Sequence, residues 1–432
     1  MEELNLDKRV EKLMAFLDAS PSVYHAAANL ADELKSAGYT LLQEAEDWHL
    51  VPGGKYCVMR GGSAVIAFRI PEGKARGFLM SASHSDRPTF KIKENCELTG
   101  SYTRLAVERY GGMLIAPWLD RPLSVAGRVL VETENGVQSK LLNIDKDLLL
   151  IPNVAIHMNR QANDGYKWNP VTDVLPLMGG KDAKGKFQAL LEQEAGGRIL
   201  GHDLFLYIRQ KAAVWGIDDE YISSAALDDL ECAWCCTQGF LAAKESEEIP
   251  VLCVFNNEEV GSSSNEGAAS NLLESVLERI CARLGLSLPR MLSQSFMISA
   301  DNGHALHPNH PELADPTNAP LPGGGVVLKF NAAQRYCTDG VSAAVLRKVC
   351  EKAGVGIQTY CNRADIPGGG TLGNISLHHV SVPTADIGLA QLAMHSCYET
   401  ASVSDALALE DAMAAYYGSG LELSGDGSFL LK

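Results

Sequence analysis

Residues that could perform metal-assisted chemistry stand directly after short apolar runs of this sequence. Residues 251–255 (VLCVF) have the β-branched and aromatic composition of a buried strand, and Glu258 and Glu259 follow them. A second apolar run leads into His84 and Asp86 in the same way. In an α/β sheet, ligands bind in the crevice beyond the carboxyl ends of the strands. These side chains are therefore candidates for one shared site.

Three more polar residues occupy comparable positions after short apolar segments: Asp228, Asp301 and His395. One such residue taken alone is more often structural than functional. Two histidines combined with several carboxylates, however, form a ligand set suited to zinc, manganese or cobalt. The recurrence of these residues at strand ends favours a divalent metal site.

The spacing of these residues suggests separate roles. Residues two apart in extended chain point to the same side, so Asp86 can orient the imidazole of His84. The adjacent Glu258 and Glu259 cannot point the same way, so one can bind metal while the other acts as a general base on the attacking water. Asp228 could bridge two ions about 3.5–4 Å apart, as in two-metal hydrolytic sites.

Three other motifs have simpler interpretations. The glycines of 368–373 fit the G-x-G-x-x-G pattern, but they follow Ile-Pro instead of a clear strand and lack the acidic partner of a dinucleotide site. A loop passing close to a substrate fits them better. The cysteines of 232–236 lack the second pair of a zinc ribbon, so we expect buried thiols. In the H-x-x-H-x-x-H run at 304–310, prolines prevent the helix that would align the rings.

Charge and composition exclude several classes of protein. The sequence has 37 Lys and Arg against 53 Asp and Glu, a net charge of −16. Nucleic acids and anionic membranes bind clustered cations, so neither is an expected partner. No apolar run reaches the roughly 18 residues of a membrane span. The N-terminus shows no secretory signal and the eleven cysteines have no disulfide framework, so we expect a cytoplasmic protein.

The hydrophobic pattern predicts an α/β fold interrupted by a β-rich insertion. Strands and helices alternate on both sides of a central segment that has short β-type runs and many turn signals. The predicted catalytic domain comprises residues 1–93 and 222–432, and the inserted domain comprises 94–221. The predicted strands outside the insertion are a hairpin at 56–60 and 64–70 and single strands at 77–82, 251–255, 296–300, 326–330 and 380–387. The predicted helices lie at 10–17, at 21–36 with Ser20 as N-cap, after 225–230 and through Phe240, at 264–284 and at 342–353.

Eight short motifs in a fixed order make the chain resemble the M18 family of metallo-aminopeptidases, aspartyl aminopeptidase and its bacterial relatives, nearly from end to end. The motifs lie at 83–88 (SHSDRP), 110–112 with 118–123 (YGG, WLDRPL), 151–160, 227–228, 257–262 (NEEVGS), 299–301 with 307–309 (SAD, HPN), 331–336 and 391–396 (QLAMHS).

The resemblance implies an α/β/α sandwich of the zinc-exopeptidase type with an inserted β-rich dimerisation domain. It also implies two divalent ions, zinc first and manganese or cobalt as alternatives. By the same resemblance, His84 and Asp301 would hold one ion, Glu259 and His395 would hold the other, Asp228 would bridge them, Glu258 would be the general base, and Asp86 would support His84.

The resemblance implies a substrate and an assembly as well. Peptides with acidic N-terminal residues would be the substrates, with Lys329 near the substrate carboxylate and with Tyr336 and Gly370 lining the pocket. His157 would reach a neighbouring subunit's site across a dimer contact, within a dodecamer built from dimers. Departures at Arg87, Ala226, Asp229 and Asn256 leave the ligand set intact but change the charges around the cleft.

The sequence therefore predicts a di-metal aminopeptidase. An enzyme of the same mechanism with broad or neutral specificity is the first alternative. A nucleotide-dependent oxidoreductase would rest on the glycine loop alone. A non-catalytic peptide-binding homologue would have no need of a general base, and Glu258 and all five ligands are present.

Overall fold

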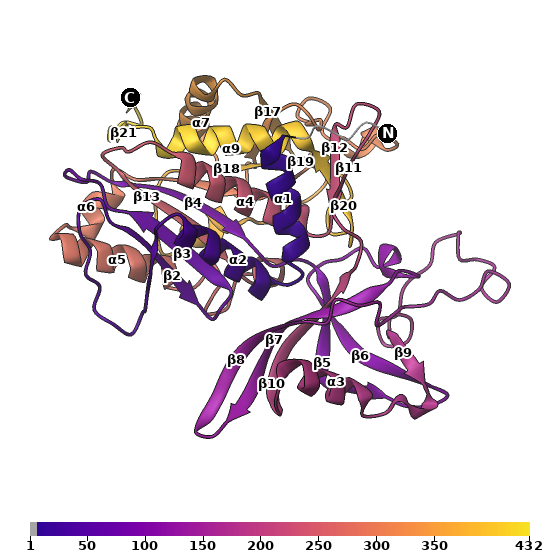
Figure 1. Ribbon diagram of the computed structural model, residues 1–432. Coiled ribbons are helices and arrows are strands. Elements are labelled where there is room, and N and C mark those ends of the chain that lie inside the picture. The colour runs from indigo at the N-terminus through magenta and orange to yellow at the C-terminus, as the bar shows by residue number, and fades with distance from the viewer. Residues whose placement is uncertain (1–6) are drawn as a thin grey trace.

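A twisted nine-stranded sheet forms the centre of the computed structural model, which describes residues 7–432 (Figure 1). Its strand order is β1-β2-β3-β13-β4-β14-β18-β16-β17. The strands are β1 (Thr40–Leu42), β2 (Lys55–Arg60), β3 (Ala64–Arg69), β4 (Phe78–His84), β13 (Ile249–Phe255), β14 (Phe296–Ala300), β16 (Val326–Phe330), β17 (Ile357–Cys361) and β18 (Thr384–Gly388).

Helices cover both faces of this sheet because its central strands are apolar on both sides. In β13, Leu252 and Val254 belong to one hydrophobic cluster, whereas Val251, Cys253 and Phe255 belong to the other. The first cluster includes α1 (Lys8–Ala19), α2 (Val23–Ser36), α4 (Leu227–Ala242), α7 (Gly340–Ala353) and α9 (Val403–Tyr417). The second includes α5 (Leu272–Leu284), α6 (Leu288–Leu292) and α8 (Leu372–Ser376). The predicted α/β/α sandwich is confirmed.

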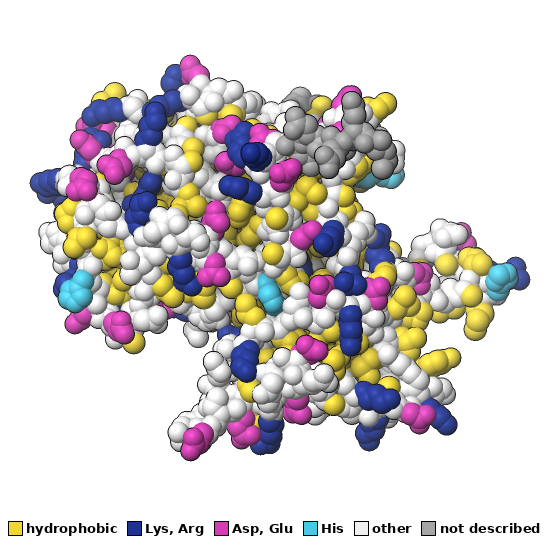
Figure 2. Space-filling view, viewed as in Figure 1, with side chains coloured by type: hydrophobic (Ala, Val, Ile, Leu, Met, Phe, Trp, Pro, Cys, Tyr) yellow, Lys and Arg dark blue, Asp and Glu magenta, His cyan; other side chains and the backbone are white. Residues whose placement is uncertain are grey.

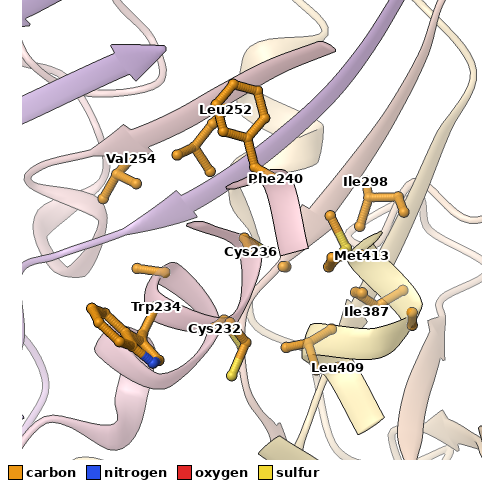
Figure 3. Packing of buried hydrophobic residues seen from close by; sticks show 14 of the residues in the cluster. Cys232, Trp234, Cys236, Phe240, Leu252, Val254, Ile298, Ile387, Leu409 and Met413 are labelled. Atoms are coloured by element: carbon orange, nitrogen blue, oxygen red, sulfur yellow. The ribbon is translucent and has the colours of Figure 1, made fainter. Parts of the chain in front are cut away.

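The packing of α4 and α9 against the sheet fixes the position of the α4 N-terminus. Figure 3 shows side chains of the two helices meeting those of the central strands. The labelled residues are Cys232, Trp234, Cys236 and Phe240 of α4, Leu409 and Met413 of α9, and Leu252, Val254, Ile298 and Ile387 of the sheet.

Strands β4, β13, β14 and β18 run parallel to one another, so their carboxyl ends meet at one edge of the sheet. His84 is the last residue of β4, and Asp301 directly follows β14. The parallel pairing thus brings together side chains that are far apart in the sequence, which is the arrangement expected for a site at the carboxyl edge.

A second, antiparallel sheet forms the β-rich part of the chain and has its own hydrophobic cluster. Its order is β8-β7-β10-β5-β6-β9. The elements are β5 (Thr89–Leu98), β6 (Tyr102–Tyr110), β7 (Leu123–Thr133), β8 (Gly136–Asn143), β9 (Leu177–Gly180), α3 (Lys186–Ala195) and β10 (Ile199–Ile208). The domain limits at 93/94 and 221/222 stay a prediction.

A long loop between β8 and β9 extends away from both sheets (Figure 1). Figure 2 shows hydrophobic side chains on its surface. In the same loop, Met158 is 83% exposed and Val171 is 74% exposed. Such a projecting apolar segment is unusual for a surface that faces water alone.

Smaller strands complete the fold: β11 (Ala213–Trp215), β12 (Tyr221–Ser224) and β20 (Glu399–Ser402) in a three-stranded sheet, β15 (Gly303–His304) with β19 (Ala390–Gln391), and β21 (Leu421–Leu423) with β22 (Phe429–Leu431). Four short 3₁₀ turns lie at Ala116–Trp118, Lys181–Ala183, Glu258–Val260 and Pro311–Leu313. Within residues 7–432, no helix combines the length and apolarity needed to cross a bilayer.

Several predicted boundaries were wrong, and three of them have a visible cause. The helix expected from residue 264 begins at Leu272, because the preceding residues turn back and the Glu266 carbonyl accepts a bond from the Asn256 N–H. The helix expected from Pro21, with Ser20 as N-cap, begins at Val23 after the extended Ser22. The strand expected from residue 380 begins at Thr384, just after a proline that has no N–H to donate.

Candidate metal centre

Histidine and carboxylate side chains converge at the carboxyl edge of the nine-stranded sheet. Three overlapping groups have ligand atoms within 4.8 Å of one another: His84, Glu258 and Glu259; His84, Asp228 and Asp301; and Asp228, Glu259 and His395. All five predicted ligands and the predicted base are members. These groups come from β4, the first turn of α4, the 3₁₀ turn after β13, the end of β14 and the loop before β20.

Asp228 lies between the two histidines. Its Oδ1 is 3.5 Å from the Nε2 of His84, and its Oδ2 is 3.5 Å from the Nε2 of His395. The Nε2 of His395 is also 3.4 Å from Glu259 Oε2, and the Nε2 of His84 is 4.0 Å from Glu258 Oε2. A carboxylate whose two oxygens face different histidines has the geometry of a bridging ligand.

Asp86 holds two sides of the cluster together. Its Oδ1 accepts a hydrogen bond from the Glu258 N–H at 3.1 Å and lies 3.4 Å from the Nδ1 of His84. Its Oδ2 accepts from the Tyr110 hydroxyl at 2.7 Å and from the Glu259 N–H at 3.2 Å. The Nδ1 of His84 also makes a hydrogen bond with the main-chain carbonyl of Asp86 at 3.1 Å, so this residue contacts one histidine and both glutamates.

Burial and like charge act together on the carboxylates of this centre. Burial, together with the nearby Asp301, Asp86 and Asp228, raises the pKa of Glu258 to about 7 against the opposing effect of His84. Burial, followed by Asp228, also raises the pKa of Glu259 well above its usual range. Conversely, burial would lower the pKa of His84, but Asp228 and Asp86 raise it well above normal. The carboxylates of this cluster therefore carry more negative charge than the neighbouring cationic groups can balance.

The donor set fits divalent metal ions. The Oδ1 of Asp228 and the Oε1 of Glu259 are buried and have no hydrogen-bond partner among the described residues. A buried carboxylate oxygen without a partner is costly, and a cation removes that cost. Imidazole nitrogens and carboxylate oxygens in this number are typical ligands of zinc and similar ions.

Two of the predicted substrate residues lie beside the centre. Lys329 is 2% exposed, and its Nζ donates to the Asn302 carbonyl at 3.2 Å and lies 4.0 Å from Asp301 Oδ2. The ring centroid of Tyr336 is 5.3 Å from the same Nζ. Burial lowers the pKa of Lys329, but Asp301, Tyr336 and Asp386 together outweigh burial and raise that pKa.

A cavity of about 370 Å³ is lined among others by His304, Tyr360, Gln391 and Met394. The ring centroid of Tyr360 is 6.2 Å from that of Tyr336. Met394 directly precedes His395, so the cavity adjoins the metal centre. Gly369 also lines it, whereas the neighbouring Gly370 lies in an exposed loop.

His157 is not in this group. It is exposed, it lies in the loop between β8 and β9, and it belongs to none of the three candidate metal groups of the described chain. The cysteines of 232–236 are buried free thiols. The rings of His307 and His310 lie 5.3 Å apart but likewise belong to none of those groups.

The departures from the family pattern have visible contacts. Asn256 accepts a hydrogen bond from its neighbour's N–H through Oδ1 and donates to Ser63 through Nδ2 at 3.0 Å. Asp229 accepts from the His84 N–H at 3.1 Å. Arg87 donates to the Pro21 carbonyl. Each therefore contributes to backbone placement around the centre.

Sequence reasoning missed two buried polar residues. Glu399 accepts hydrogen bonds from the backbone of two predicted ligands, and Asn302 donates to the Leu227 carbonyl at 3.2 Å, just before Asp228. Their contacts run from side chain to distant backbone, so residue type and spacing give no signal for them.

Comparison with known proteins yields relatives that span the chain. A family described as Aminopeptidase I zinc metalloprotease (M18) matches residues 16–417. The chain is 41% identical over 423 residues to the probable M18 family aminopeptidase 2 of Clostridium acetobutylicum, covering 94% of this chain and 98% of that protein. It is also similar to the structure of the Ape4 and Nbr1 complex, with a TM-score of 0.92, 34% identity and coverage of 95% and 85%. The S. cerevisiae mApe1 dodecamer has a TM-score of 0.83, 25% identity and coverage of 95% and 96%.

Proposed function

Because this chain belongs to the M18 family of zinc metallo-aminopeptidases, we propose that it removes the N-terminal residue of peptides at a centre of two divalent ions. The observation that carries the proposal is the convergence of two histidines and four carboxylates where the parallel strands end. In the proposed ligand set, His84 and Asp301 hold one ion, Glu259 and His395 hold the other, and Asp228 bridges them.

Bound at this centre, the ions would polarise the scissile carbonyl and lower the pKa of water. Glu258 is the proposed general base: its side chain is 15% exposed and its Oε2 faces the His84 edge of the cluster. It would take a proton from the attacking water and return it to the leaving amine. Asp86 would keep Glu258 in place through the bond from its N–H.

We propose that acidic N-terminal residues are preferred, because the Lys329 ammonium is a buried cation beside the centre. A substrate carboxylate could pair with it in the neighbourhood of Tyr336. Asp301 already neutralises part of this charge, so broad or neutral specificity is the alternative that the same geometry allows. Gly370 would contribute through the loop that borders the cavity.

The proposed assembly is a dodecamer built from dimers, in the cytoplasm. The exposed apolar loop between β8 and β9 supports a subunit contact, and a related structure is a dodecamer. His157 lies in this loop and would reach a neighbouring subunit's site. The glycine loop at 368–373 leads only into the five-residue helix α8, which gives no support to a nucleotide-dependent oxidoreductase.

Metal removal tests the centre as a whole. Purified protein is stripped with a chelator, and cleavage of aspartyl-, glutamyl- and leucyl-anilides is measured before stripping, after it, and after zinc, manganese or cobalt is added back. We expect activity to disappear and then to return with metal. Activity that survives complete metal removal would contradict the proposal.

The substitution Glu258→Gln tests the base separately. It keeps the side-chain volume and should retain metal content, while kcat falls by roughly 10²–10⁴ because proton transfer is lost. Metal content by elemental analysis provides the control, since a variant that has lost metal would be inactive for another reason. Full activity with normal metal content would show that the assigned base is wrong.

A further inference from the structure

Glu399 connects two of the proposed metal ligands through their backbone. Its side chain is 1% exposed and lies at the start of β20. Oε2 accepts a hydrogen bond from the Asp228 N–H at 3.0 Å, and Oε1 accepts one from the His395 N–H at 2.7 Å. One carboxylate therefore fixes two residues that are 167 positions apart in the sequence, as their numbers show.

These two N–H groups have no place in regular secondary structure. Asp228 lies in the first turn of α4 with non-helical φ and ψ of −85° and 106°. His395 has a φ of 66°, in a loop between strands. A buried N–H without an acceptor costs free energy comparable to a lost hydrogen bond, so both depend on Glu399.

The side chains of the same two residues point at each other. Asp228 Oδ2 and His395 Nε2 lie 3.5 Å apart, and the Nε2 of His395 is 3.4 Å from Glu259. A small rotation of either backbone would move the side chain attached to it and would change these distances. Asp86 contacts His84 and the backbone of the two glutamates in a similar way, but within the described residues its hydrogen bonds do not reach His395.

We propose that Glu399 is a positioning residue that holds Asp228 and His395 at the separation needed to bind one metal ion together. The inference rests on the proposed function, since it assumes that these residues bind metal. Glu399 is buried and both its carboxylate oxygens accept hydrogen bonds from backbone N–H groups, so its effect passes through the two ligands. Its loss should weaken the ion at Glu259 and His395 most.

The substitution Glu399→Gln separates shape from hydrogen bonding. Glutamine has the same length, but its amide nitrogen is a donor, so one of the two backbone N–H groups would face another donor. Asp405→Asn is the matched control. Asp405 is also buried, and its carboxylate likewise accepts from two backbone N–H groups, those of Gly323 and Gly325, but it belongs to none of the candidate metal groups.

The test measures zinc affinity of the metal-free proteins by competition with a chromophoric chelator. We expect Glu399→Gln to bind the weaker of its zinc ions roughly 10–100-fold less tightly than the wild type, as for other residues that orient ligands. Asp405→Asn should lower the melting temperature but keep wild-type zinc affinity. If both variants bind zinc as the wild type does, the inference is overturned. A wild type that binds no zinc would instead overturn the proposed function.

Two further measurements test the proposal even if Glu399→Gln fails to fold. Glu399→Asp keeps both acceptor oxygens but is one methylene shorter, so it should reach only one N–H and also lose zinc affinity; wild-type affinity would overturn the inference. Hydrogen exchange in the metal-free wild type needs no variant. The amides of Asp228 and His395 should exchange slowly, and exchange as fast as in exposed loops would overturn the role of Glu399.

Discussion

In the centre, burial and neighbouring charges have opposite effects on the charged state of a side chain, and Lys329 is an example. Its ammonium is a buried cation that faces Asp301 at 4.0 Å and donates to the Asn302 carbonyl. The same cation can stabilise a metal ligand and attract a substrate carboxylate. Which of these uses dominates determines whether acidic substrates are preferred.

Replacing Lys329 with methionine separates the two uses. The variant keeps the side-chain volume, so we expect cleavage of aspartyl-anilide to fall relative to leucyl-anilide by roughly 10–100-fold in kcat/KM, the value of a charged hydrogen bond. Lys348→Met, at an exposed lysine paired with Glu351, is the control and should leave the ratio unchanged. An unchanged ratio in Lys329→Met would remove Lys329 from substrate recognition.

His25 gives a pH dependence that is independent of the metal centre. Burial, with a contribution from the Arg87 cation, lowers the pKa of His25 to about 4. Below pH 6.5 the unfolded chain takes up a proton that the folded chain refuses, so stability is full above pH 6.5 and falls as the pH drops toward 4. The loss is at most about 3 kcal/mol.

The corresponding measurement is urea unfolding of the metal-free protein between pH 4 and pH 8. His25→Gln should remove this part of the acid destabilisation, so its free energy of unfolding should decline less steeply below pH 6.5 than that of the wild type. His378→Gln, at an exposed histidine, should follow the wild type. Parallel curves for the wild type and His25→Gln would contradict the assignment.

For single residues, the sequence was sufficient to locate the candidate metal ligands. It was not sufficient to locate the residues that hold the backbone of those ligands in place. His84, Asp228 and Asp301 could be found because metal-binding residue types follow apolar runs. Glu399 and Asn302 could not, since their partners are backbone groups from distant segments. No residue pattern encodes a contact of that kind.

At the scale of elements, close packing between α4 and α9 determines where Asp228 lies. Gly239 of α4 faces α9 so closely that an added Cβ would lie 2.5 Å from the Met413 Cβ and 2.9 Å from the Glu410 carbonyl. Both contacts are near the backbone and cannot move aside as a flexible side chain would. The glycine is therefore required by the distance between the helices, and any residue there must push α4 outward.

Gly239→Ala should consequently destabilise the fold by roughly 1–3 kcal/mol through overpacking. Thermal and urea unfolding measure this loss. Gly340→Ala provides the control, because Gly340 begins α7 and an added Cβ would meet nothing within 4 Å. That variant should be neutral or up to about 1 kcal/mol more stable. Equal stability of both variants would show that α9 can move aside to accommodate the added methyl group.

The elements themselves were largely predictable, and the most misplaced boundary has a long-range cause. The strand expected at 296–300 matches β14, and the hairpin expected around Gly61 and Gly62 matches β2 and β3, because periodicity and turn residues are local signals. The helix expected from residue 264 begins late because its first residues bond to the end of β13 instead. Such competition between local and long-range bonds is invisible in a periodic pattern.

At the scale of the whole molecule, the loop between β8 and β9 determines how subunits could act on one another. It carries exposed apolar side chains beside His157, which is apart from the metal groups of its own chain. Burying these side chains against a second copy would offset their exposure to water. In a two-fold contact, each subunit would then give its His157 to the other.

Mixed dimers can test this exchange directly. His157→Ala and Glu258→Gln should each lose most activity alone, the first by removing the donated histidine and the second by removing the base. When the two variants are co-expressed with different tags, a mixed dimer contains one centre with an intact Glu258 and an intact His157 donated by its partner.

Random pairing should therefore restore about a quarter of wild-type activity, since half of the dimers are mixed and each has one complete centre. Assemblies carrying both tags, isolated in sequence on the two affinity columns, should contain these mixed dimers and be more active than either parent assembly. If these mixed dimers are no more active than either parent, then His157 acts within its own subunit or not at all, and the proposed exchange across the contact fails even if the assembly itself is correct.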